Sequence, residues 1–290
     1  MDKKNYLYPL LAILFWSGNV IVSKMASHQI SPIAMTCYRL ILALAVMATF
    51  VLIPTWRNRH TIFQYWKHLA LGGFLSVSLF QFLSYQAAAT TTATNMAIVT
   101  ALIPLINIIL SVFILKEKIH SGLVIGSSLS FFGILYLLGH GHISEVFTQG
   151  VHVGLIAAIG FALYGVLLKR WKMPIPAWQA NFVMSAFALV YVLPVFVFLP
   201  ATQMQLNHQT VPMILYAGIF SSILLSYLWI EGVRHLGPNK NSLFMNLLPI
   251  FTSVIAVILL SESLQSFHFI GGSMTLIGIL FAQISNKKSK

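Results

Sequence analysis

Long apolar segments constrain this chain more than any other feature of its sequence. An α-helix rises 1.5 Å per residue, so about 20 apolar residues are needed to cross roughly 30 Å of hydrocarbon. Ten such segments recur along the 290 residues, at 6–24, 32–53, 68–88, 94–115, 122–139, 151–169, 178–199, 212–232, 241–260 and 267–285. They predict an all-α polytopic membrane protein with ten transmembrane helices.

The composition supports lipid as the main solvent of this chain. Hydrophobic residues make up 58% of the sequence and charged residues 8%, whereas soluble proteins average about 45–50% apolar and about 25% charged residues. The single cysteine, Cys37, excludes an intramolecular disulfide and a cysteine-based metal site, since both need a second thiol. What the net charge of +12 indicates depends on where the basic residues lie along the chain.

The basic residues gather in alternate connectors between the predicted helices. Fifteen of the 17 Lys and Arg residues fall on one side of the predicted membrane: Lys3, Lys4, Arg57, Arg59, Lys67, Lys116, Lys118, Lys169, Arg170, Lys172, Arg234, Lys240, Lys287, Lys288 and Lys290. Positive residues stay on the cytoplasmic side, so we expect both termini in the cytoplasm and the chain in a bacterial inner membrane. The start "MDKKNYLYPLLAILFW" also resembles a signal peptide, but no small-x-small cleavage site follows it.

The two halves of the chain repeat each other at a spacing of 145 residues, half of 290. The matching pairs include Gly73 and Gly218, Ser76 and Ser221, Pro104 and Pro249, Glu117 and Glu262, and Gly133 and Gly278. So many matches at one shift indicate a duplication, with repeats at 1–145 and 146–290. Each half holds five predicted helices, so the second half enters the membrane inverted. A 5+5 inverted repeat is typical of secondary transporters, whose substrate site lies near the midplane between the halves.

Three segments resemble the EamA family of the drug/metabolite transporter superfamily. The segment "SPIAMTCYRLILAL" is similar to the second span of that family, and "YQAAATTTATNMAIVTALIPLINIILSVFILKEKI" to the signature of its third to fifth spans. That signature recurs in "LWIEGVRHLGPNKNSLFMNLLPIFTSVIAVILLSESL". The resemblance implies a ten-helix carrier that exports small metabolites, with the fifth and tenth helices together at one side and the other eight around a central cavity. It implies no particular substrate.

Aromatic and amide side chains within the predicted spans are candidates for lining a substrate cavity. Aromatic rings with a polar handle suit partly apolar organic solutes. However, such rings also anchor helices at membrane interfaces, and amides also join helices by hydrogen bonds. The candidates of this kind are Trp16, Asn19, Gln81, Tyr85, Tyr164, Trp229 and Asn246.

Arg39 is a basic residue inside the second predicted span, roughly 12 Å from its start at 1.5 Å per residue. An arginine there costs at least about 2.5 kcal/mol unless it finds a partner or water. Its counterpart at the 145-residue spacing is Met184, so the scaffold does not need a base at this depth. Two interpretations stay open: an anchor for a substrate carboxylate, and a structural pairing, for example with a helix end.

Two pairs of repeated residues are assigned to gating or to the scaffold. Pro104 and Pro249 each free a backbone carbonyl four residues back and can bend a helix, which fits a gate or a static kink. Glu117 and Glu262 each end the fourth helix of their half and face the start of the fifth, where free N–H groups attract an acid. We therefore interpret both glutamates as scaffold.

These patterns predict a secondary transporter that exports amino acids or related small metabolites by alternating access. A lipophilic drug-like cargo is the alternative. An intramembrane enzyme is disfavoured, because the sequence has no HExxH, no pair of deep aspartates and no defensible Ser-His pair at one depth. We therefore expect no catalytic residue, no metal site and no cofactor.

The five acidic residues all lie at predicted span ends or in loops, so no proton-coupling carboxylate is evident. Glu231 is the nearest candidate, but Arg234 and His235, one turn further on, are expected to pair with it. The expected partners are lipid and a small-molecule substrate, without nucleic acid. We expect a monomer or a weak homodimer.

Overall fold

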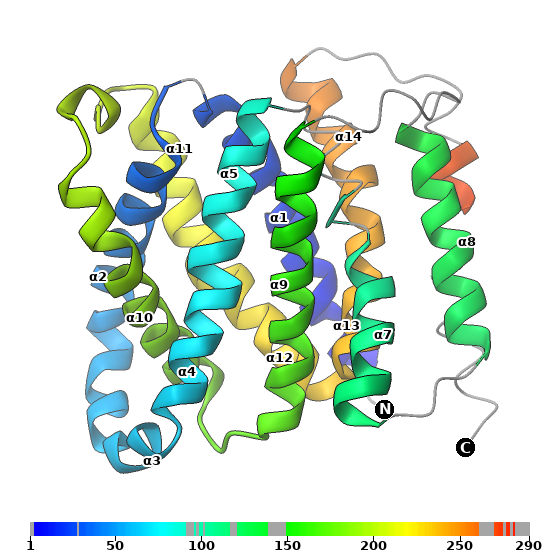
Figure 1. Cartoon of the computed structure of the whole chain (residues 1–290), viewed down its shortest axis with the longest axis horizontal. Helices are drawn as coiled ribbons and strands as arrows, with labels where there is room; N and C mark the ends of the chain where they lie inside the picture. Colours follow the sequence, from blue (N-terminus) through cyan, green and yellow to red (C-terminus); the bar gives the residue numbers. More distant parts are fainter. Residues whose placement is uncertain are drawn as a thin grey trace.

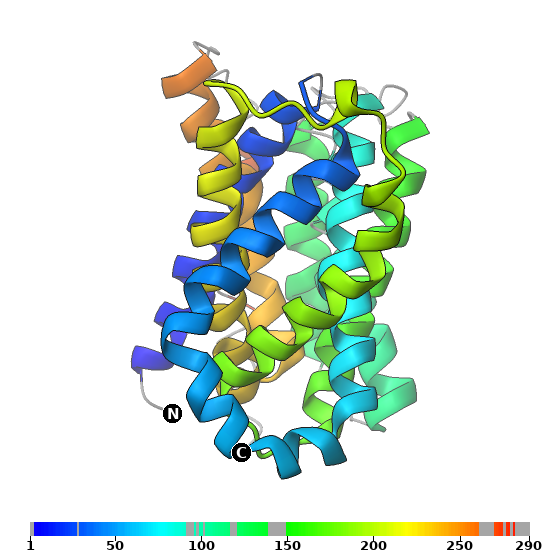
Figure 2. The same cartoon turned by 90° about the vertical axis from the view of Figure 1, so that its left-hand side faces the viewer.

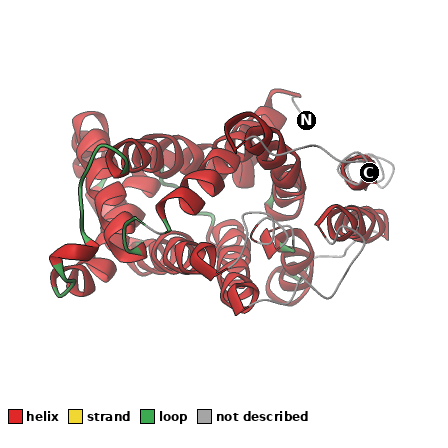
Figure 3. Cartoon of the chain, turned by 90° about the horizontal axis from the view of Figure 1, so that it is seen from above, coloured by secondary structure: helices red, strands yellow, loops and turns green. Residues whose placement is uncertain are grey.

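The computed structural model describes residues 3–27, 29–90, 96, 99–100, 102–116, 121–138, 149–260, 270–274, 277–278 and 281. Within these residues all regular structure is helical, and no strand is present (Figures 1 and 3). The first half contains α1 (Leu7–Ala26), α2 (Pro32–Arg57), α3 (Arg59–Gln64), α4 (Trp66–Gly73), the π-helical segment η2 (Phe74–Leu79), α5 (Phe80–Thr90), α7 (Ile103–Leu115) and α8 (Ser121–Leu138). The second half contains α9 (Gln149–Trp171), α10 (Ala177–Val197), α11 (Thr210–Tyr216), the π-helical segment η5 (Ala217–Leu225), α12 (Ser226–Leu236), α13 (Pro238–Ser242), the 3-10 segment η6 (Leu243–Leu247) and α14 (Leu248–Leu260).

Six of the described helices are long and apolar enough to cross a membrane: Lys4–Ala26, Pro32–Arg57, Trp66–Thr90, Gly150–Trp171, Ala177–Val197 and Thr210–Leu236. Helices α7 and α8 are apolar but shorter in the described part of the chain. Large apolar side chains such as Phe113 and Phe198, which are 76% and 87% exposed, face outward where lipid would cover them. The chain is therefore a multi-pass, all-helical membrane protein. The predicted span 267–285 is described at only a few positions, so the count of ten stays a prediction.

Helix α2, which carries Arg39, begins where its sequence predicts. The Ser31 hydroxyl accepts a hydrogen bond from the Ala34 backbone N–H at 3.2 Å, which caps one of the free donors at the helix start. Pro32 occupies the first helical position, where its missing N–H costs nothing. Arg39 follows two turns further on and is buried.

The helix bounds recur at the same spacing as the sequence repeat. Helix α10 begins 145 residues after α2, and α14 has the bounds of α7 shifted by 145 at both ends. A π-helical segment interrupts the third long helix of each half, in η2 and in η5. Such local i→i+5 windings are rare and are frequent at functional sites.

Helices α2 and α10 pack against each other and run side by side on one side of the bundle (Figure 2). A Cβ on Gly73 would lie 2.3 Å from the backbone oxygen of Met184 in α10, and a Cβ on Gly218 would lie 3.2 Å from the backbone oxygen of Arg39 in α2. Gly73, directly before η2, and Gly218, within η5, thus let these parts of the chain approach the long helix of the opposite half. These crossings bring Arg39 and Met184 towards the middle of the molecule.

Helix α8 stands at one edge of the bundle (Figure 1). A Cβ on Gly278 would lie 2.5 Å from the Ser130 backbone nitrogen and 2.6 Å from the Gly126 backbone oxygen. The small residues at these positions therefore let the two segments approach closely.

Pro104 and Pro249 lie near helix starts rather than in helix middles. Pro104 is the second residue of α7, and Pro249 is the second residue of α14, directly after the 3-10 segment η6. Pro249 has no N–H to donate to the backbone carbonyl four residues earlier. That carbonyl belongs to η6, where the chain has the tighter 3-10 winding with i→i+3 hydrogen bonds. Glu117 and Glu262 lie outside the described residues, so their scaffold role stays a prediction.

Candidate functional site

A cavity of about 30 Å³ lies between α1, α2, α5, α9, α10, α12 and the two π-helical segments. This volume has room for about two water molecules. Six of the eight predicted binding residues line it: Trp16, Asn19, Arg39, Gln81, Tyr164 and Trp229. Ten further residues that we did not propose as binding residues also line it: Ser76, Val77, Phe161, Asn181, Met184, Ser185, Ser222, Leu225, Ser226 and Ile230.

The Arg39 side chain is 1% exposed and is held by hydrogen bonds to neutral side chains. Its Nε donates to the Ser222 Oγ at 2.9 Å. Its Nη1 donates to the Gln81 Oε1 at 2.8 Å, to the Tyr85 hydroxyl at 2.9 Å and, at 3.4 Å, to the Asn19 Oδ1. The acceptors come from α1, η5 and the η2–α5 helix, so the guanidinium links both halves of the molecule.

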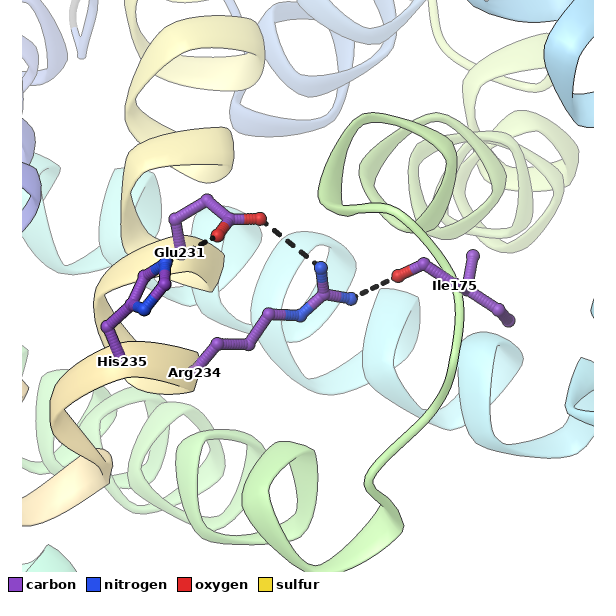
Figure 4. Close-up of polar contacts among 4 residues, drawn as sticks. All are labelled: Ile175, Glu231, Arg234 and His235. Atoms are coloured by element: carbon purple, nitrogen blue, oxygen red, sulfur yellow. Dashed lines mark hydrogen bonds and ion pairs between the residues drawn. The ribbon is translucent and has the colours of Figure 1, made fainter.

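The charge of Arg39 has no acidic partner among the residues that the structure describes. Glu231 is the only acid in that part of the chain. Its carboxylate contacts the Arg234 Nη1 at 3.2 Å and the His235 Nε2 at 3.3 Å (Figure 4), which confirms the predicted pairing. Arg234 also donates to the Ile175 backbone oxygen. A buried charge without a counter-charge is costly, and Arg39 is partly compensated by its neutral acceptors.

The π-helical segment η5 supplies acceptors that a regular helix would use internally. The Asn181 Nδ2 on α10 donates to the Ser222 backbone oxygen at 3.0 Å, and the Ser226 Oγ donates to the Ser221 backbone oxygen at 3.2 Å. The Ser221 Oγ donates to the Asn19 Oδ1 at 2.8 Å. Side chains therefore satisfy the carbonyls that the altered winding frees.

Aromatic rings form an apolar wall of the cavity. The Trp16 ring lies edge-on to the Phe161 ring at 4.9 Å and to the Trp229 ring at 5.6 Å between centroids, and Phe161 and Trp229 are 5.1 Å apart. Such edge-to-face pairs add to the stability gained from burial. The Trp229 Nε1 is buried and has no hydrogen-bond acceptor among the described residues.

Tyr85 and Asn246 lie outside the cavity lining. The Tyr85 hydroxyl accepts a hydrogen bond from Arg39, and the Arg39 Cζ lies 6.0 Å from the centre of the Tyr85 ring. This tyrosine therefore contacts the guanidinium from outside the cavity lining. The Asn246 Nδ2 donates to the Ser130 Oγ at 2.6 Å and joins η6 to α8. Asn246 thus makes the interhelical bond that was the alternative to cavity lining.

A second, larger cleft of about 750 Å³ lies at the end of the bundle where α9 and α12 end, at the bottom of Figure 1. Four basic side chains line it, from Lys169, Lys172, Arg234 and His235. Helices α9 and α12 line the central cavity with residues 161–164 and 226–230 and line the cleft with residues 168–169 and 233–236. The two spaces therefore lie one to two turns apart along the same helices.

Comparison with known proteins finds one family. The EamA-like transporter family matches residues 3–139 and again residues 148–283. The chain is 26% identical over 290 residues to the uncharacterized transporter YyaM of Bacillus subtilis (strain 168), covering 97% of this chain and 94% of that protein. It is 23% identical over 304 residues to a protein of Escherichia coli (strain K12) named "Probable amino-acid metabolite efflux pump", covering 96% and 94%. A solved crystal structure superposes with a TM-score of 0.78 at 18% identity over the whole of both chains, which shows a shared fold.

Proposed function

Because this chain belongs to the EamA-like transporter family, we propose that it is a secondary transporter that exports small organic metabolites across the bacterial inner membrane. The proposed cargo is an amino acid or a related compound. The Escherichia coli relative named as an amino-acid metabolite efflux pump supports this choice. The proposed mechanism is alternating access around the central cavity.

The observation that carries the proposal is the buried Arg39 at a cavity shared by both halves. At the 145-residue spacing, Trp16 pairs with Phe161, Asn19 with Tyr164 and Arg39 with Met184, and all six line the cavity. Secondary transporters built from inverted repeats hold their substrate at such an interface near the midplane. An intramembrane polar site is by default a functional one.

The proposed topology is a 5+5 inverted repeat, 1–145 and 146–290, with both termini in the cytoplasm. Two separate family matches and the recurrence of helix bounds at 145 residues support the duplication. The ends of α2, α7, α9 and α12, next to basic connectors, lie at one end of the bundle (Figure 1), which supports a single cytoplasmic face.

Transport requires a conformation wider than this one. Sites for small organic molecules have volumes of about 300–1,000 Å³, whereas this cavity has about 30 Å³. We propose that the two halves rock against each other at the Gly73 and Gly218 crossings, and that Pro104 and Pro249, at the starts of α7 and α14, act as gating positions. The compact cavity then corresponds to a closed state between inward and outward openings.

The aromatic wall of Trp16, Phe161 and Trp229 favours one alternative cargo, a lipophilic drug-like compound. The test is transport by purified protein in liposomes loaded with amino acids, organic acids or a cationic dye, against liposomes without protein. Faster loss of an amino acid or organic acid supports the proposed cargo, and loss of the dye alone supports the alternative. No faster loss of any compound would exclude both.

A further inference from the structure

We infer that the central site recognises a monocarboxylate with an aromatic or apolar body, and that it offers no counter-charge to an α-ammonium group. This inference rests on the proposed function and narrows its substrate class. The expected order of binding is a carboxylate without an amino group first, then the zwitterion, then the amine.

The first argument is the unbalanced charge at the cavity. Arg39 lines the cavity with one positive charge, and its described hydrogen bonds use Nε and Nη1. The Nη2 donates to none of the described residues, so its two N–H groups are available to a ligand. A carboxylate is the group whose geometry and charge best match a guanidinium in a site removed from water.

The second argument is that the site holds a single charge. Met184 occupies the position that corresponds to Arg39 in the other half, and it also lines the cavity. A dicarboxylate would therefore leave one carboxylate without a cationic partner in a buried site, where an unpaired charge is costly. The site accordingly fits a monoanion.

The third argument is that the cavity offers no negative charge to an ammonium group. The residues lining the cavity include no acid, and of the three amide oxygens at the cavity, those of Asn19 and Gln81 already accept from Arg39, which leaves the Asn181 Oδ1 as a neutral acceptor. An ammonium group bound here would lose its water and would lie near a guanidinium of the same sign. A zwitterion is therefore expected to bind more weakly than its deaminated counterpart.

The aromatic wall and two open polar atoms describe the rest of the ligand. Trp16, Phe161 and Trp229 offer ring edges and faces to an apolar body. The Trp229 Nε1 and the Ser185 Oγ are buried and have no partner among the described residues. A donor left unpaired in an apolar site costs free energy, so both atoms favour a ligand with an additional acceptor oxygen.

The basic cleft gives an independent reason for an anionic cargo. Lys169, Lys172, Arg234 and His235 line it, and Glu231 pairs with the last two without cancelling the positive excess. Clefts lined by charges of one sign raise the local concentration of ions of the opposite sign. The cleft therefore concentrates anions next to α9 and α12, the two helices that also line the cavity of Arg39.

The test compares three ligands that share a phenylethyl body: 3-phenylpropanoate, L-phenylalanine and 2-phenylethylamine. Their affinities are measured by titration calorimetry on the full chain in lipid nanodiscs at neutral pH. We expect 3-phenylpropanoate to bind at least tenfold more tightly than 2-phenylethylamine and more tightly than L-phenylalanine. Equal or tighter binding of the amine or the zwitterion would overturn the inference, and so would the absence of binding by all three ligands at 10 mM.

Variants of Arg39 test whether this residue causes the expected preference for a carboxylate. Arg39→Met is expected to reduce 3-phenylpropanoate binding at least tenfold and to strengthen 2-phenylethylamine binding, because a charge of the same sign is removed. Arg59→Met removes an exposed arginine on α3 and is the matched control, with no change for any ligand expected. If Arg39→Met does not fold, Arg39→Lys keeps the charge without the bidentate fork, and a loss of at least threefold is expected. Unchanged carboxylate binding in either variant would overturn the assignment to Arg39.

The inference and the proposed function fail in different ways. Transport of L-phenylalanine or of another amino acid, combined with no carboxylate preference in binding, would overturn the inference and leave the exporter function intact. No transport of any compound in liposomes, combined with tight carboxylate binding, would overturn the exporter function and leave the site chemistry intact.

Discussion

Replacement of Gly73 by alanine tests the close crossing between η2 and α10. The new Cβ would lie 2.3 Å from the Met184 backbone oxygen, about 1 Å closer than the shortest ordinary C···O contacts near 3.3 Å. The atom in the way is backbone, so relief requires α10 to move, and overpacking of this kind costs about 1–3 kcal/mol. Alanine in a helix also gains roughly 0.5–1 kcal/mol over glycine.

Gly165→Ala is the matched control for this helix-propensity gain. Gly165 lies inside α9, and its new Cβ would meet the Asn107 Oδ1 at 3.6 Å, an ordinary van der Waals distance. The propensity gain is common to both variants, so their difference isolates the overpacking cost of about 1–3 kcal/mol. At roughly 2–4 °C per kcal/mol, Gly73→Ala should melt about 2–12 °C below Gly165→Ala.

The single cysteine provides the assay. Cys37 is buried and free, so a thiol-reactive dye labels it only as the protein unfolds on heating. Transport should fall in Gly73→Ala as well, because Met184 and its neighbours on α10 line the cavity. A Gly73→Ala variant that melts with or above Gly165→Ala would refute the close crossing and the role given to it in transport.

Three further predictions concern single side chains. Asn246→Leu removes the hydrogen bond to the Ser130 Oγ and should lower the free energy of unfolding by about 0.6–1.7 kcal/mol. The expected observation is a lower melting temperature with unchanged ligand affinity. A loss of affinity would show that Asn246 contributes to ligand binding after all. Glu231→Gln breaks two partly exposed ion pairs and should change stability by less than about 1 kcal/mol; a larger loss of melting temperature would contradict this weak pairing. Lys172→Gln should raise the half-saturating concentration of an anionic cargo at low salt. The difference from wild type should vanish at about 1 M salt, where the Debye length falls to about 3 Å. A difference that persists at high salt would exclude electrostatic steering as its cause.

The helix bounds could be predicted from the sequence because the signals are local. An apolar run of fixed length, Ser31 as a cap and Pro32 at a first helical position are all visible in neighbouring residues. The two π-helical segments were not predicted. An extra residue in one turn changes the hydrogen-bond register without changing the composition, so Phe74–Leu79 and Ala217–Leu225 look like ordinary apolar helix.

The site could be predicted only in part because it depends on contacts between distant segments. Trp16, Arg39 and Trp229 stood out as polar or aromatic residues deep in a span, and all three line the cavity. Asn181 and Ser185 did not stand out, because their direction depends on the crossing of α10 with η2. The partners of Arg39 lie 20 to 183 residues away along the chain, so no local pattern could decide between a structural pairing and a substrate anchor.

The two halves differ in the residues that surround this position. The four acceptors of Arg39 are Asn19, Gln81, Tyr85 and Ser222, and their counterparts at the 145-residue spacing are Tyr164, Ser226, Ile230 and Val77. Two of these four counterparts, Ile230 and Val77, are apolar. The loss of the cation and of two of its acceptors occur together, because an acceptor left without a donor in lipid is itself costly. The cavity therefore combines a polar region around Arg39 with a less polar one around Met184, which is the arrangement that the proposed ligand with one charged end requires.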